Sequence, residues 1–145
     1  MKTVREILKS KISGNGILTI TPDETVLHAI KVMAEKNIGA LLVLENDKLV
    51  GIITERDYAR KVILAGKSSS NTTVREIMDQ KLLVIKPVTT IEECMALMVE
   101  NAVRYLPVID DGRVTGVISM GNVVTSVITE QKYVINNLQQ YIMQG

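Results

Sequence analysis

The sequence predicts an α/β fold of the mixed (α+β) kind, in which two tandem β-α-β-β-α units pack with pseudo-two-fold symmetry. A repeat is the first reason: the 145-residue chain restates its first half sixty-five positions later. The second reason is that both copies alternate short apolar runs with stretches of helical periodicity, in the same order. The third is an apolar fraction of 46%, which lets two small units complete one another's core.

The repeat needs no gap between Ile20, which matches Ile85, and Ile63, which matches Ile128. So many matches in one register are poorly explained by chance, and they indicate two copies of one structural unit. The other identical pairs include Pro22 with Pro87, Thr25 with Thr90, Met33 with Met98, Leu41 with Leu106, Val43 with Val108, and Gly51 with Gly116.

The repeat also sets the expected domain organisation. Residues 1–145 form one module, with a first motif over 3–66, a linker over 67–71, a second motif over 72–130 and a helical extension over 131–145. A short amphipathic helix at 3–8 recurs at 73–78, seventy positions later, so the first copy carries five extra residues within 9–16. That segment is rich in glycine and is predicted to be a loop.

In the first copy, the periodicity of the apolar residues predicts the helices and strands. Its hairpin is the clearest, because two apolar runs are joined by a short polar turn. In order, we expect a strand over 17–20, a helix from Pro22 to Lys36, strands over 40–44 and 49–53, and a helix from Thr54 to Ala65.

The second copy repeats this order, and an Asp-Gly turn marks its hairpin. Its last helix continues beyond the repeat with further apolar residues. Two explanations stay open for that extension: it pairs with another molecule, or it packs back on its own domain. The expected elements are a strand over 82–85, a helix from Thr89 to Glu100, strands over 105–109 and 114–118, and a helix from Gly121 or Asn122 to Gln144.

Composition excludes several classes of protein. The net charge of +1 and the scarcity of aromatic residues argue against a nucleic-acid partner. No apolar stretch reaches the length of a membrane helix, and the N-terminus lacks the pattern of a signal peptide. With a single cysteine, Cys94, the chain fits a reducing compartment, so we expect a cytoplasmic protein. A single histidine is too few for a metal site, so we expect none. The sequence also shows no nucleophile with a matching base, so we do not expect an enzyme.

Each copy carries a short polar motif directly after its hairpin. In the first copy Thr54 and Asp57 are one helical turn apart, so both side chains face the same way at the start of a helix. A hydroxyl beside free backbone N–H groups suits an anion, and a carboxylate can accept both hydroxyls of a ribose. The alternative is that Thr54 only caps the helix and Asp57 only complements its dipole.

With these motifs the chain resembles the cystathionine β-synthase (CBS) domain family. The residues that carry the resemblance are 51–57, 116–122 and 103–108, and it extends from Val4 to about Ile128. The resemblance implies a stand-alone CBS pair, or Bateman module, that forms a homodimer. It further implies a regulatory adenosine ligand (AMP, ADP, ATP, NAD or S-adenosylmethionine), no catalytic cofactor, and an unidentified protein target.

The resemblance also assigns the first cleft. Asp57 matches the acid that holds the ribose, and Thr54 matches the hydroxyl beside it. For phosphate it points to Arg104 first and Arg56 second, because a guanidinium pairs well with phosphate oxygens. The residues that would line the base and complete the cleft are Lys81, Leu82, Leu83, Val103 and Tyr105.

The second cleft departs from the family pattern. Asn122 replaces the acid and Ser119 replaces the threonine, so the charge that strengthens hydrogen bonds to a ribose is missing. We therefore expect this cleft to bind more weakly, to take a different ligand or to stay empty. Its other expected residues are Ile17, Leu18, Ile38, Gly39 and Ala40, none of them basic.

Two other functions remain open from the sequence. One is a structural homodimerisation module that binds no nucleotide, whose clefts would be filled by its own side chains. The other is an enzyme that acts on an adenine nucleotide, which would need a general base beyond Asp57 in the first cleft.

Overall fold

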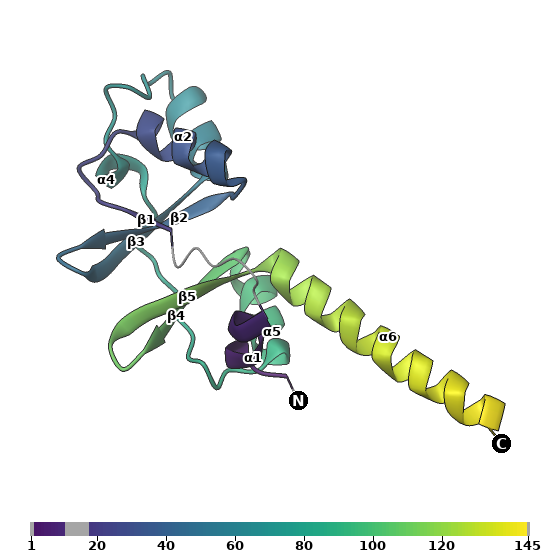
Figure 1. Ribbon diagram of the computed structural model, residues 1–145. Coiled ribbons are helices and arrows are strands. Elements are labelled where there is room, and N and C mark those ends of the chain that lie inside the picture. Colours follow the sequence, from purple (N-terminus) through teal and green to yellow (C-terminus); the bar gives the residue numbers. More distant parts are fainter. Residues whose placement is uncertain (1, 11–17, 145) are drawn as a thin grey trace.

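A computed structural model describes residues 2–10 and 18–144. Most of the loop expected within 9–16, and Ile17 of the expected first strand and second cleft, lie outside these residues. The chain folds into two halves, one above the other in Figure 1, and a long C-terminal helix leaves the lower half.

The first half is a three-stranded sheet covered by helices. Strand β1 (Thr19–Ile20) runs parallel to β2 (Ala40–Glu45), and β2 runs antiparallel to β3 (Lys48–Thr54). Helix α2 (Val26–Lys36) begins four residues later than predicted from Pro22, because the Thr25 hydroxyl caps it by accepting from the His28 N–H. The helix predicted from Thr54 is a short α3 (Glu55–Tyr58) that continues as a π-helix, η1 (Ala59–Ile63).

The second half repeats this arrangement with one strand fewer. Its hairpin is β4 (Tyr105–Asp110) and β5 (Arg113–Ser119), and helix α5 (Ile91–Asn101) follows its cap at Thr90. The strand predicted over 82–85 is wrong. Only Ile85 forms a bridge, parallel to Val108, because the residues before it line a cleft instead of pairing with β4.

Two short helices are exchanged between the halves. Helix α1 (Val4–Ser10) packs on the second half, and α4 (Val74–Ile77) packs on the first. The N–H of Val4 donates to the carbonyl of Thr89, at 2.8 Å, and the N–H of Val74 donates to the carbonyl of Glu24, at 2.9 Å. Each short helix therefore completes the core of the half whose strands lie in the other sequence copy. Each folded half therefore contains one short helix from the other sequence copy, so the folded halves and the sequence repeats have different boundaries.

Two aliphatic cores result, one in each half. Cys94 is a small buried residue of the second core, as predicted, and burial raises the pKa of its thiol to about 11. The buried residues of the first core are Ile20, Val26, Ala29, Met33, Leu41, Val43, Ile53, Val62, Val74, Ile77 and Met78. Those of the second are Val4, Ile7, Ile85, Ile91, Cys94, Met98, Leu106, Val108, Ile118 and Val123.

The exchanged segments explain the glycine in each hairpin. A Cβ atom at Gly51 would lie 2.7 Å from the sulfur of Met78, the residue after α4. A Cβ atom at Gly116 would lie 2.6 Å from a methyl group of Leu8, in α1. An added Cβ atom would force Met78 or Leu8 to shift, so glycine is favoured where the exchanged segment crosses each strand.

Helix α6 (Met120–Gln144) extends away from the body of the molecule as a rod (Figure 1). Its first turns pack against α5 and β5, and Val123 is buried there. All residues from 128 to 143 are exposed, so of the two explanations left open by the sequence, the one in which the extension packs back on its own domain does not hold. Among the described residues, no helix is long and apolar enough to cross a membrane.

Candidate functional site: a cleft between the two halves

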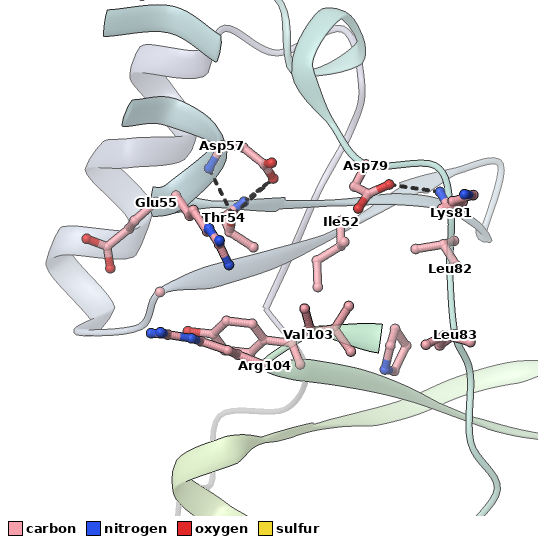
Figure 2. A pocket seen from close by; sticks show the side chains of 15 residues that line it. Ile52, Thr54, Glu55, Asp57, Asp79, Lys81, Leu82, Leu83, Val103 and Arg104 are labelled. Carbon is pink, nitrogen blue, oxygen red and sulfur yellow. Dashed lines mark hydrogen bonds between the residues drawn. The ribbon is translucent and has the colours of Figure 1, made fainter. Parts of the chain in front are cut away.

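A cleft of about 380 Å³ opens between the halves, within the roughly 300–1,000 Å³ of small-molecule sites. Three segments form its walls: the end of β3 with α3, the stretch after α4, and the start of β4 (Figure 2). All nine residues predicted for the first cleft line it. The complete lining is Gly39, Ile52, Thr54, Glu55, Arg56, Asp57, Asp79, Lys81, Leu82, Leu83, Ala102, Val103, Arg104, Tyr105 and Pro107.

Thr54 and Asp57 form a capping box at the cleft wall. The Thr54 hydroxyl accepts from the Asp57 N–H at 3.0 Å, and Asp57 Oδ2 accepts from the Thr54 N–H at 3.1 Å and from its hydroxyl at 3.0 Å. The helix cap, which the sequence offered as an alternative to a ligand site, is therefore present. A cap and a ligand site are compatible here, because the same bonds fix the carboxylate at the edge of the cleft.

Lys61 holds the other oxygen of this carboxylate, and the sequence reading missed it. Its ammonium lies 3.2 Å from Asp57 Oδ1 and donates to the carbonyl of Ile77 at 2.9 Å. The Asp57 side chain is 15% exposed, so a ligand can still reach it. The spacing of four residues between an acid and a lysine on a helix was the signal that could have revealed this pair.

One side of the cleft is apolar. Leu82, Leu83 and Val103 lie across from the polar Thr54 and Asp57 in Figure 2. The segment before Leu82 is anchored to β3, because Ile52 and Asp79 exchange two backbone hydrogen bonds of 3.1 and 2.9 Å. This anchoring holds the apolar segment in place beside the β3 wall.

Charges of both signs surround the apolar part. Arg56, Lys81 and Arg104 supply positive charge, and all three are exposed at the rim. Arg104 lies at the opposite end of the cleft from Leu83 (Figure 2). Glu55 and Asp79 add negative charge to that of Asp57, and the sequence reading assigned neither of them to the cleft.

Tyr105 and Gly39 meet at one end of the cleft. A Cβ atom at Gly39 would clash with the Tyr105 hydroxyl and would lie 3.2 Å from a carboxylate oxygen of Glu55. Desolvation, with a smaller contribution from Glu55, raises the pKa of Tyr105, and Arg104 acts in the opposite direction. Gly39, which we expected in the second cleft, thus lines the first, where its lack of a side chain makes room for the tyrosine.

The second motif has the same local geometry with weaker groups. The Ser119 N–H donates to Asn122 Oδ1 at 2.9 Å, and the Asn122 N–H donates to the Ser119 hydroxyl at 3.1 Å. Leu18, Ile38 and Ala40, also expected here, are partly buried. An amide in place of the carboxylate leaves this position without a charge.

The first cleft thus combines an apolar wall, a fixed carboxylate and basic side chains. Over residues 2–10 and 18–144, no three His, Cys, Asp or Glu side chains are grouped so that they could hold a metal ion. The fold is a module of two repeated motifs with a cleft between its halves. The chain belongs to the CBS domain family, whose profile matches it twice, over residues 4–63 and 74–129.

Several relatives share nearly the full length of the chain. It is 42% identical to the mitochondrial CBS domain-containing protein CBSX3 of Arabidopsis thaliana, over 99% of this chain and 73% of the relative. A solved structure from Burkholderia ambifaria, described as a candidate signal-transduction protein with CBS domains, is 53% identical. It has a TM-score of 0.86 over 90% of this chain and 96% of its own. A CBS-domain protein from Agrobacterium tumefaciens is 29% identical, with a TM-score of 0.80 over 86% and 98%.

The chain is also similar to part of an enzyme. It is 33% identical to inosine-5'-monophosphate dehydrogenase of Nitrosopumilus maritimus, but the match covers only 24% of that enzyme. The similarity therefore concerns a CBS pair and extends no catalytic assignment to this chain. What the comparisons support is a CBS-domain pair of the regulatory kind found in proteins linked to signal transduction.

Proposed function

We propose that this CBS pair senses an adenosine-containing nucleotide in the first cleft and relays its presence to a partner protein. AMP, ADP, ATP, NAD and S-adenosylmethionine are the ligands considered. The observation that carries the proposal is the Asp57 carboxylate, which the Thr54 cap fixes at the cleft wall with 15% of its side chain exposed. A fixed carboxylate is a strong acceptor for the two hydroxyls of a ribose.

The remaining walls suit the other parts of such a ligand. The base would lie between Ile52 on β3 and the apolar side chains Leu82, Leu83 and Val103. The phosphates would face Arg104, with Arg56 and Lys81 adding positive charge at the rim. Three cations against three acids give this cleft no net charge, which favours a ligand with few phosphates over a highly charged one.

A relay has a physical route through Lys61. The Lys61 ammonium joins Asp57 Oδ1 to the carbonyl of Ile77 at the end of α4. A ribose that binds Asp57 must share this oxygen with Lys61 or displace it, and the contact with α4 changes in the second case. Binding would then alter how the exchanged helix sits on the first core, which a partner protein could detect. No catalytic step is needed for this role.

A thermal-shift series tests the proposal. Wild-type protein is heated alone and with AMP, ADP, ATP, NAD or S-adenosylmethionine at millimolar concentration. A ligand at about 100 times its dissociation constant should stabilise the fold by roughly 2.7 kcal/mol. An Arg104→Ala variant should keep its unliganded melting temperature, because the side chain is exposed, but should lose most of the shift from a phosphorylated ligand. The absence of a shift with all five ligands would refute nucleotide sensing and favour the structural dimerisation module.

A further inference from the structure

Helix α6 carries an apolar stripe that the chain itself leaves uncovered. Ile128, Ile135 and Ile142 recur every seven residues, and Val124, Gln131 and Leu138 recur between them at the alternate spacing of four and three. This is the heptad pattern of helices that pair along a seam, with isoleucine at one core position and valine, glutamine and leucine at the other. Val127, Val134 and Tyr141 follow the same seven-residue interval and widen the stripe on one side.

The stripe is exposed along most of its length. Ile135, Leu138 and Ile142 are 53%, 56% and 74% exposed. Beyond the first turns of α6, the described residues place no other element against it, and Figure 1 shows the rod standing clear of both halves. A single helix gains most of its stability from packing of its apolar face, so a free rod of this length lacks its main source of stability.

We propose that this stripe pairs with α6 of a second copy of the chain. An apolar seam that repeats every seven residues is complementary to a second copy of itself. A seam that binds an unrelated partner does not need this property. Glu130 and Lys132 are the only charged residues of α6, and they cancel, so two copies meet without electrostatic repulsion. A membrane surface fits less well, because helices that lie on lipid carry many basic residues on their polar face.

The exposed area agrees with this occupant. A standard stable interface buries about 800 Å² on each partner. Seven apolar residues of the stripe are between 46% and 78% exposed, so one helix offers an apolar surface that approaches this size when it is fully covered. They are Val124, Ile128, Val134, Ile135, Leu138, Tyr141 and Ile142. This surface is available for pairing of two α6 helices whether or not the cleft binds nucleotide.

Sedimentation velocity of the full chain tests the pairing. We expect wild-type protein to sediment as a dimer at micromolar concentration, with twice the chain mass of 16.0 kDa. A double substitution in the stripe, Ile135→Glu with Leu138→Glu, should yield monomer. Both residues are exposed in the single chain, so the body should stay folded, and its melting temperature with and without AMP verifies this.

The matched control places the same charges on the opposite face of the same helix. Asn136→Glu with Gln140→Glu adds two carboxylates at exposed positions outside the stripe, and this variant should remain dimeric. A monomeric wild type would overturn the proposal and leave the stripe to a different partner. It would equally be overturned if the stripe variant stayed dimeric, or if both variants dissociated to the same extent.

Discussion

The two halves share a scaffold but differ in the side chains that follow the hairpin. Both cap the next helix with a hydroxyl, from Thr54 in the first half and Ser119 in the second. The capping partner is a carboxylate, Asp57, in the first half and an amide, Asn122, in the second. The backbone geometry thus survives the exchange of acid for amide, so the charge of Asp57 is not needed for the fold and is available for a ligand.

The next turn of the helix widens this difference. Lys61 pairs with Asp57 and reaches the carbonyl of Ile77, whereas Ser126 occupies the equivalent position sixty-five residues later. The Ser126 hydroxyl is buried and has no hydrogen-bond partner among the described residues. One copy has a linked acid, lysine and carbonyl where the other has an amide and an isolated hydroxyl. A repeat can therefore keep its fold while only one copy keeps the charged site.

The largest expected effect concerns the exchanged helices. Ile77→Ala in α4 and Ile7→Ala in α1 each remove a buried side chain, and each should lower the free energy of unfolding by about 2–5 kcal/mol. Because α4 packs on the first core, Ile77→Ala should reduce hydrogen-exchange protection mainly in β2 and β3. Ile7→Ala should reduce it mainly in β4 and β5. Loss of protection confined to each residue's own sequence copy would contradict the exchange.

A smaller effect should follow from filling the hairpin glycines. Gly51→Ala places a methyl group against Met78 and the backbone of Asp79, while Gly116→Ala places one against the flexible side chain of Leu8 alone. Overpacking of this kind costs about 1–3 kcal/mol, and Gly51→Ala should cost more because a backbone atom yields less readily. Urea denaturation of both variants measures the difference. Equal costs would show that the side chains alone absorb the strain.

Substitutions of Lys61 and Ser126, which occupy equivalent positions in the two copies, should change stability in opposite directions. Lys61→Met leaves the Ile77 carbonyl without this donor and Asp57 without its cation, and should lower stability by about 1 kcal/mol. Ser126→Ala removes a buried hydroxyl that lacks a partner, and should be neutral or slightly stabilising. Thermal denaturation compares the two variants. A destabilising Ser126→Ala would reveal a hydrogen bond at that hydroxyl.

The smallest expected effect is a pH dependence at the start of α4. The Thr73 N–H lowers the pKa of Glu76 below its ordinary value. The folded state therefore gains stability above the ordinary pKa of a glutamate, and this gain is lost as the pH falls through the lowered value. Glu76→Gln should flatten the decline in melting temperature between about pH 5 and pH 3. An unchanged slope would show that this cap does not contribute to acid sensitivity.

The sequence predicted much of this molecule because the repeat constrained it. Positions matched at an interval of sixty-five residues predicted the two hairpins and the main helices, and the resemblance to the CBS family supplied the nine residues that line the first cleft. Patterns of this kind report burial and local turn chemistry, which the amino-acid types carry directly.

What the sequence did not predict depends on long-range contacts. The exchange of α1 and α4 is invisible in a repeat, because each short helix looks the same whichever core it joins. For the same reason the reading missed Asp79, which a bridge to Ile52 brings to the cleft. The strand expected at 82–85 failed because an apolar run can line a cleft as well as pair in a sheet. Glu55 was overlooked between two residues that were assigned.

Calorimetric titration of AMP into a reciprocal pair of variants tests the central claim most directly. Asp57→Asn gives the first cleft the amide that the second half already tolerates, so the protein should fold normally. We expect this variant to lose at least tenfold in affinity, because hydrogen bonds to a charged acceptor contribute about 1.5–3 kcal/mol. Asn122→Asp should leave the affinity of the first cleft unchanged. Undiminished binding by Asp57→Asn would show that the carboxylate does not hold the ribose, and the account of the site would be wrong.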